Sequence, residues 1–270
     1  MSTEHQDSLE WNAQTAYKCY YESGAYDSRY PCCNSRVLNT ISQYTRYATR
    51  ILDFGCGSGR YTVPLLMNTT ASVVAYDVCA AALQQLRARL RSEPCGDRVI
   101  CCNEPFEALH TLGTYDVILA MFGVISHIAR RSERIRLLEG LRTLLTRSPE
   151  SRLIISVPNS YRRFWWQQMR HTYLRRTGRP LPPAFEPGDI FYSRTMAEEC
   201  ISMFYHLYSV SGIREELETA GYDILGVLPE SLLPENWVTG SRILNRLDAV
   251  VSRRLPPQLA YGIVIVAGAY

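Results

Sequence analysis

The segment ILDFGCGSG, residues 51–59, is the most informative part of the 270-residue chain. Its first four residues form a short apolar run that ends at a glycine, which is typical of a strand buried in a parallel sheet. Glycines then follow at alternate positions, 55, 57 and 59, where they allow a sharp turn and the close approach of a ligand. Asp53 stands within the end of this predicted strand. A glycine-rich turn between a strand and a helix predicts a nucleotide-binding α/β fold, although such a turn alone is a weak signal.

A second acidic residue strengthens this prediction. Asp77 follows Gly59 by 18 residues and stands at the end of the next predicted strand, Ser72–Tyr76. A carboxylate at this place can accept hydrogen bonds from both hydroxyls of a ribose, each contributing about 1.5–3 kcal/mol. Ligands of doubly wound sheets bind outside the carboxyl ends of the central strands, where both motifs emerge. A dehydrogenase is disfavoured, because the glycines are spaced G-x-G-x-G and a dinucleotide does not explain Asp53.

Predicted strands and amphipathic helices alternate from residue 35 onward. The predicted helices cover residues 35–48, 62–67, 80–90, 132–145 and 212–220, and the other predicted strands cover 98–101, 115–121, 153–157, 223–227 and 262–267. This alternation predicts a mostly parallel sheet with helices on both faces. We expect an N-terminal helical arm at residues 1–34 and one domain at 35–270, with insertions at about 159–210 and 231–259.

Four segments of the chain resemble the class I S-adenosylmethionine-dependent methyltransferases. They are ILDFGCGSGRY (51–61), VAYD (74–77), YDVI (115–118) with His127 after it, and LIISVPN (153–159). The resemblance is close over roughly residues 26–160 and looser over the last two strands. It implies a Rossmann-like, doubly wound, mostly parallel sheet of seven strands with an antiparallel last strand. It also implies methyltransferase activity and S-adenosylmethionine as the cofactor.

The resemblance further implies where the cofactor lies. Its methionine tail is expected near Asp53 and the glycines, its ribose on Asp77, and its adenine at the loop after the third strand. Many members carry an aspartate in that loop where this chain has Asn103, whose amide oxygen can still accept from the adenine amino group. The expected cofactor-binding residues are Tyr26, Asp53, Gly55, Cys56, Gly57, Gly59, Asp77, Val78, Asn103, Glu104 and Met121.

Two histidines are candidate general bases, which methyl transfer needs only when the acceptor must lose a proton. His127 follows the fourth predicted strand at the carboxyl edge, and His206 lies just before the helix at 212–220. The alternative interpretation of His127 is a residue that shapes its loop. The alternative interpretation of His206 is a satisfied histidine in an aromatic packing cluster.

Aromatic residues outside the cofactor motifs are the candidate acceptor-binding residues. They are Tyr30 of the arm and Tyr161, Trp165 and Tyr205 of the first insertion. We expect this insertion to overhang the acceptor side as a lid whose aromatics enclose an apolar or planar substrate. Its interleaved arginines and aromatics could instead bind RNA. A third interpretation is a solvated helical elaboration with buried tryptophans.

The composition argues against several classes of protein. Hydrophobic residues make up 46% of the chain and charged residues 20%, which argues against wholesale disorder. The net charge of +3 predicts no broad basic surface for nucleic acid or an anionic membrane. None of the nine cysteines falls in a C-x-x-C unit, so we expect no metal. The polar start of the chain lacks a signal-peptide core, and the last apolar run is too short for a bilayer, so we expect a cytoplasmic protein with no membrane partner.

Among acceptors we favour a small molecule, methylated at oxygen or nitrogen as in secondary metabolism. The first alternative is a tRNA methyltransferase, because FYHLY at residues 204–208 resembles a segment of enzymes that act on a modified wobble uridine. The second alternative is a partner subunit that binds the cofactor without catalysis, since binding alone does not prove transfer. The oligomeric state stays open.

Overall fold

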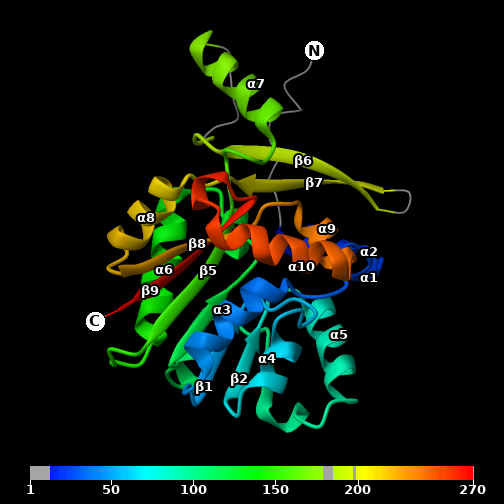
Figure 1. Ribbon diagram of the computed structural model, residues 1–270, viewed down its shortest axis with the longest axis vertical. Coiled ribbons are helices and arrows are strands. Elements are labelled where there is room, and N and C mark those ends of the chain that lie inside the picture. Colours follow the sequence, from blue (N-terminus) through cyan, green and yellow to red (C-terminus); the bar gives the residue numbers. More distant parts are fainter. Residues whose placement is uncertain (1–12, 179–184, 197–198, 270) are drawn as a thin grey trace.

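The computed structural model describes residues 13–178, 185–196 and 199–269, and its centre is a seven-stranded sheet (Figure 1). The strand order is β3-β2-β1-β4-β5-β9-β8. The strands are β1 (Arg50–Phe54), β2 (Ser72–Tyr76), β3 (Val99–Cys102), β4 (Val117–Ala120), β5 (Arg152–Pro158), β8 (Asp223–Ser231) and β9 (Gly262–Gly268). Strands β1 to β5 are parallel, and β9 is antiparallel to both of its neighbours. The predicted doubly wound, mostly parallel sheet is confirmed.

Successive strand residues point to opposite sides of the sheet. Helices cover both of these faces. Leu52, Val74 and Ile118 belong to a core packed against α6 (Arg131–Leu144) and α8 (Val210–Thr219). The neighbouring residues Ile51 and Val73 belong to the opposite core. The helices over that core are α3 (Ser35–Thr45), α4 (Thr62–Asn68) and α5 (Ala80–Leu90).

The strand order reverses beside β1, and this reversal determines where a ligand is expected to bind. The chain runs outward from β1 through β2 to β3 and then returns to the other side of β1 as β4. The carboxyl ends of β1 and β4 are therefore the place at which a doubly wound sheet is expected to bind its ligand.

The first insertion contains a long hairpin that the sequence did not predict. The hairpin consists of β6 (Asp189–Met196) and β7 (Glu199–His206), and α7 (Trp165–Arg176) precedes it. In Figure 1 the hairpin lies across the top of the sheet, and α7 projects beyond it. No residue of α7 is buried, so this helix is an exposed elaboration in the structure.

Two further parts flank the same edge of the sheet. The second insertion forms α9 (Glu235–Gly240) and α10 (Arg242–Val251). The N-terminal arm forms α1 (Ala13–Glu22) and α2 (Ala25–Arg29), while residues 1–12 of the expected arm lie outside the described residues. Within the described part of the chain, no helix combines the length and apolar composition needed to cross a bilayer.

Candidate active site

The glycine loop after β1 is shaped by three left-handed residues. Gly55, Gly57 and Gly59 have φ angles of 76°, 57° and 86°. A Cβ on Gly59 would lie 2.3 Å from a methyl carbon of Leu86, so this glycine allows the loop to pack on α5. A Cβ on Gly57 would lie 2.2 Å from the Tyr21 hydroxyl oxygen, on the side where the arm covers the loop. Gly57 therefore allows the Tyr21 hydroxyl to lie directly against the backbone of the loop.

Asp77 lies beside Gly57 at the end of β2. Its Oδ2 accepts a hydrogen bond from the Gly57 N–H and its Oδ1 accepts one from the Cys79 N–H, both at 2.8 Å. Burial raises the pKa of Asp77 above its ordinary value, and these two N–H donors oppose the rise. Each carboxylate oxygen has two lone pairs, so both can still accept a hydroxyl proton.

Asp53 lies beneath the glycine loop rather than on its surface. Only 2% of the residue is exposed, and its Oδ2 accepts a hydrogen bond of 2.6 Å from the Thr62 hydroxyl. Burial raises the pKa of Asp53 to about 6, although the Thr62 hydroxyl lowers it. Cys56 and Met121, which were also predicted, are buried in the adjoining core.

The residues predicted for the adenine side follow β2 and β3 at the same edge. Val78 is 48% exposed, and Asn103 and Glu104 are exposed as well. The Asp77 N–H donates to the Cys102 carbonyl at 3.1 Å, which brings the start of the Asn103 loop beside Asp77. These side chains form an open rim next to the predicted ribose site.

Tyrosines of the N-terminal arm pack beside the glycine loop. Tyr20, Tyr21, Tyr26 and Tyr30 form one buried cluster. The ring centroids of Tyr21 and Tyr26 are 4.6 Å apart. Asp27 ties the arm to the loop, because it accepts a 2.7 Å hydrogen bond from Ser58 and pairs with Arg89 at 2.7 Å. The arm is thus joined to the glycine loop through Asp27, and the cofactor-binding role of Tyr26 stays a prediction.

Residues 51–148 match the family model described as a methyltransferase domain. The match begins on β1 and includes the glycine loop, Asp77 and the loop after β4. This part of the chain is therefore a methyltransferase domain, and the fold of the chain is that of S-adenosylmethionine-dependent methyltransferases. The left-handed glycine turn and the carboxylate of Asp77 beside it fit the cofactor S-adenosylmethionine.

Solved structures similar to this methyltransferase agree with its fold. The CcbJ methyltransferase from Streptomyces caelestis is 15% identical, with 90% of this chain and 89% of that chain covered and a TM-score of 0.59. An S-adenosylmethionine-dependent methyltransferase from Clostridium acetobutylicum is 11% identical, with 93% and 99% covered and a TM-score of 0.61. The glycopeptide N-methyltransferase MtfA is 16% identical, with 88% and 91% covered and a TM-score of 0.57. No curated protein sequence matches this methyltransferase.

His127 joins the arm, the β4 loop and the hairpin of the methyltransferase. Its Nδ1 lies 3.1 Å from the Phe204 carbonyl oxygen and its Nε2 lies 2.7 Å from the Tyr17 hydroxyl oxygen. A carbonyl only accepts, so Nδ1 carries the proton and Nε2 accepts from Tyr17. The ring also packs 4.9 Å from that of Tyr205. The structure thus brings His127 and Tyr205 together, and the general-base role of His127 stays a prediction.

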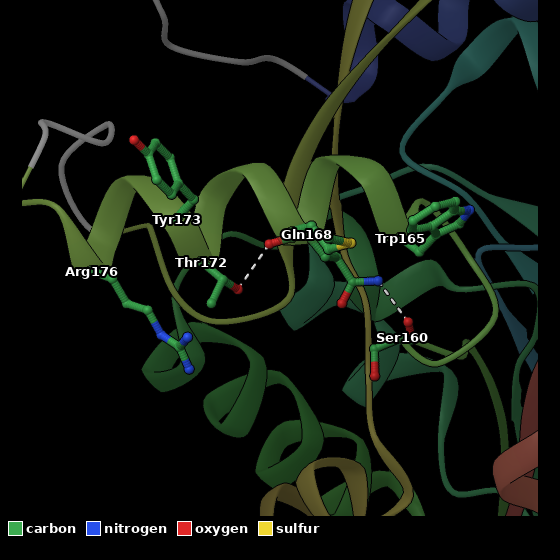
Figure 2. A pocket seen from close by; sticks show the side chains of 7 residues that line it. Ser160, Trp165, Gln168, Thr172, Tyr173 and Arg176 are labelled. Atoms are coloured by element: carbon green, nitrogen blue, oxygen red, sulfur yellow. Dashed lines mark hydrogen bonds between the residues drawn. The ribbon is translucent and has the colours of Figure 1, made fainter.

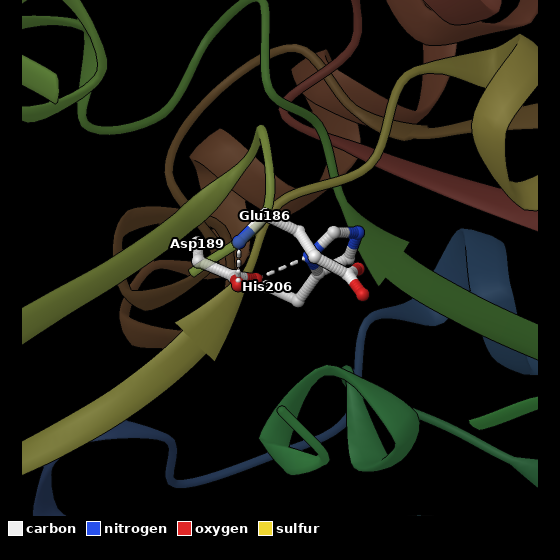
Figure 3. Close-up of side chains that lie close together, drawn as sticks. All are labelled: Glu186, Asp189 and His206. Atoms are coloured by element: carbon white, nitrogen blue, oxygen red, sulfur yellow. Dashed lines mark hydrogen bonds and ion pairs between the residues drawn. The ribbon is translucent and has the colours of Figure 1, made fainter. Parts of the chain in front are cut away.

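His206 faces away from this pair, because neighbouring strand residues point to opposite sides. Figure 3 shows its ring beside Asp189 and Glu186, with Nδ1 2.6 Å from Asp189 Oδ1. These three residues resemble a metal-binding set, but protein donors already occupy their oxygens. Asp189 Oδ2 accepts from the Glu186 N–H at 2.6 Å, and Glu186 pairs with Arg134 at 2.8 Å. The geometry therefore places His206 in a buried ion network and not beside the glycine loop.

Tyr161 and Trp165 do not join Tyr30 and Tyr205 in the described structure. Tyr161 is 70% exposed and Trp165 is 51% exposed, whereas Tyr30 and Tyr205 are buried. Figure 2 shows that Trp165 lines a shallow groove along α7. A substrate-binding role for these two residues stays a prediction.

Sequence reasoning missed a second set of buried charges at the acceptor side. Arg60 directly follows the glycine loop and pairs with Glu235, and both are less than 10% exposed. Glu230, near the end of β8, is 4% exposed, and partly buried Arg163 lies in the loop after β5. The sequence signal for Glu230 was a single acidic residue shortly after the strand predicted at 223–227. Periodicity alone does not distinguish such a residue from one on the surface.

Proposed function

We propose that this methyltransferase transfers a methyl group to a small-molecule acceptor, at nitrogen or oxygen. The observation that carries the proposal is the cluster of aromatic rings and buried charges near the carboxyl ends of β4 and β5. Phe122 packs 4.8 Å from Tyr30, and the Arg60 guanidinium lies 4.5 Å above the Phe122 ring. A mostly aromatic site with a few fixed polar groups is typical of small-molecule recognition.

Two similar structures support the same class of acceptor. MtfA is described as a glycopeptide N-methyltransferase, and RosA from Streptomyces davawensis as an N,N-8-amino-8-demethyl-D-riboflavin dimethyltransferase. Both descriptions name N-methylation of compounds that are neither nucleic acids nor large proteins. Nitrogen is therefore the first acceptor atom to test.

The residues of this chain act mainly by alignment in the proposed reaction. When bound, S-adenosylmethionine supplies an activated methyl group on a positively charged sulfur. Asp77 would hold its ribose, and the tyrosines of the arm would exclude water above the glycine loop. Holding two reactants in line can supply about 7–11 kcal/mol of the barrier.

Incubation of the protein with methyl-labelled cofactor and a small-molecule extract tests the proposal. We expect label in one low-mass product, and transfer should respond little to added salt. Label in RNA, with binding that weakens steeply with salt, would instead favour the tRNA alternative. The exposed arginines and aromatics of α7 are the observation that keeps this alternative in the test. Tight cofactor binding without label in any acceptor would favour the non-catalytic partner.

A further inference from the structure

Glu230 occupies a β-bulge near the end of β8. The register between β8 and β9 shifts between Pro229 and Ser231, so Glu230 has no opposite partner on β9. Such bulges re-aim a side chain and are common beside active sites. Because β5 and β8 are both antiparallel to β9, they run in the same direction. Pro158 and Ser231 both pair with Gly262, which places Glu230 at the carboxyl edge of the sheet.

Gly262 leaves the space that the Glu230 carboxylate occupies. A Cβ on Gly262 would lie 1.8 Å from Glu230 Oε2 and 2.8 Å from Glu230 Cδ. The φ angle of Gly262 is outside the left-handed region, so its backbone conformation suits any residue. The requirement for glycine here comes from the carboxylate that packs against it.

Glu230 is buried but not fully paired. The Ser156 hydroxyl hydrogen-bonds its carboxyl group. Within the described residues, however, no partner is found for Glu230 Oε1, Arg60 Nη1 or Arg163 Nε. A buried polar atom without a partner costs about 1–3 kcal/mol, and one explanation of such atoms is a ligand that completes them. The three atoms together offer one acceptor and two donors.

Aromatic rings surround these unpaired atoms on the side of the crevice. The Arg163 guanidinium lies 4.8 Å from the Tyr261 ring and 5.3 Å from the Tyr205 ring. Phe122 has a φ angle of 63°, and its N–H donates to Ser156 Oγ at 2.6 Å. Ser156 thus links the loop after β4 directly to Glu230. The loop after β4 borders the crevice in which the methyl group must meet the acceptor.

We propose that Glu230 is the group that takes the proton of the acceptor nucleophile. The inference rests on the proposed small-molecule function. The acceptor would present an N–H or O–H to Glu230 and a carboxylate or carbonyl oxygen to the free N–H of Arg163 or Arg60. In the step, the acceptor heteroatom forms a bond to the methyl carbon, and the carbon–sulfur bond breaks with its electron pair on sulfur. The proton of the heteroatom passes to Glu230 Oε1 and later to water.

The surroundings of Glu230 suit a group that gains and loses a proton near neutral pH. Burial, and after it the nearby Glu235, raise the pKa of Glu230 to about 8, against the opposing effects of Arg60, Arg163 and the Ser156 hydroxyl. The charged and titratable groups that face it are Glu235 of α9, Arg60 after the glycine loop, Arg163 after β5, Tyr205 of β7 and Tyr61 before α4. A bound acceptor that donates to Oε1 would favour the ionised form.

The test compares Glu230→Gln and Glu230→Asp with the wild type. The probe is the labelled low-mass product of the extract assay, and initial rates are measured from pH 6 to 9.5. A general base contributes about 10²–10⁴-fold. We therefore expect Glu230→Gln to lower transfer by at least about 100-fold, and Glu230→Asp to restore part of it. The wild-type rate should rise with pH and level off as Glu230 ionises, and Glu230→Gln should lose this rise.

Two further variants separate catalysis from folding. Gly262→Ala should lower transfer by displacing the carboxylate, with cofactor affinity by calorimetry within about twofold. Glu216→Gln is the matched control, since Glu216 is also a buried glutamate, but one whose two oxygens are paired. It should leave transfer and its pH profile unchanged at a permissive temperature. Wild-type rate and pH profile in Glu230→Gln would overturn the proposal, as would loss of the pH-dependent rise in His127→Asn alone.

A readout without the acceptor distinguishes this proposal from the proposed function. In protein labelled with ¹³C at the glutamate carboxyl, the signal missing from Glu230→Gln should titrate well above the usual glutamate range. If the wild type transfers no label, the small-molecule function fails. Titration of Glu230 at its ordinary value of 4.5 would then overturn the proton-acceptor role as well, whereas a raised titration would still support it.

Discussion

Two clusters of buried charge in this protein differ in how completely their polar atoms are paired. The anchor cluster, Arg134 with Glu216 and Glu186, joins α6, α8 and the start of the hairpin. All three guanidinium nitrogens of Arg134 donate to carboxylates or backbone carbonyls. The Tyr208 hydroxyl also donates to Glu216 at 2.9 Å. Within the described residues, no carboxylate or guanidinium atom of this cluster is left without a partner.

The acceptor cluster, Arg60 with Glu235, Glu230 and Arg163, is comparably buried and less complete. Described residues offer no partner to one nitrogen of each arginine or to one oxygen of Glu230. A satisfied buried network stabilises one structure, whereas an unsatisfied one costs free energy. On the proposed role of Glu230, the two clusters therefore differ in function because of their pairing and not because of their burial.

Replacement of Arg134 tests whether the anchor cluster stabilises the fold. Arg134→Met leaves Glu216 and Glu186 without their cation, and breaking a buried pair costs about 3–5 kcal/mol. We expect a loss of this size in the free energy of unfolding, measured by chemical denaturation. Arg130→Met, at an exposed ion pair just before α6, is the control and should change stability by at most about 1 kcal/mol. A loss below about 1 kcal/mol for Arg134→Met would show that complete pairing does not mark a structural cluster here.

Asp77 sharpens the comparison, because both of its oxygens are paired and yet we expect it to bind a ligand. Asp77→Ala removes two charge-assisted hydrogen bonds to the ribose and should weaken S-adenosylmethionine by about 10–100-fold, or about 1.4–2.7 kcal/mol. Calorimetry with the purified protein measures this directly. Asp97→Ala, at an exposed acid before β3, is the control. Equal affinity in Asp77→Ala and the control would remove the ribose role.

The stability of the acceptor cluster should depend on pH through Glu230. Its folded-state pKa is raised from 4.5 to about 8, so the folded protein binds this proton more tightly than the unfolded chain. The resulting stability is fully present below about pH 4.5 and is lost as the pH rises through 8. Glu230→Gln does not titrate, so between pH 5 and 9 the wild type should lose at least about 1 kcal/mol relative to it. Parallel stability curves for the two proteins would contradict the raised pKa.

The smallest effect is expected at His206, the edge of the anchor cluster. His206→Asn removes the ring that hydrogen-bonds Asp189 and packs 4.5 Å from Tyr208. We expect a loss of about 1 kcal/mol in stability and no change in methyl transfer. A large loss of transfer at full cofactor affinity would instead support the predicted catalytic role of His206.

The sequence by itself determined the sheet class and the cofactor side of the site. Gly55, Gly57, Gly59 and Asp77 lie within one strand–helix–strand unit, so their spacing along the chain already predicts their proximity. The family resemblance was equally informative, because it rests on those same local motifs. Such local motifs can be recognised from the sequence because they do not depend on how distant segments of the chain pack.

Only the tertiary structure decided which residues come together in the acceptor cluster. Glu230 packs against Gly262 and is influenced electrostatically by Arg163 and Arg60, all from segments that are far apart in the chain. Its direction depends on a one-residue shift in the β8–β9 register, and such a shift changes the face to which a side chain points. The same alternation separates Tyr205 from His206 on β7. Pairing between distant strands sets the directions of these side chains, and this pairing cannot be read from a local pattern of residues.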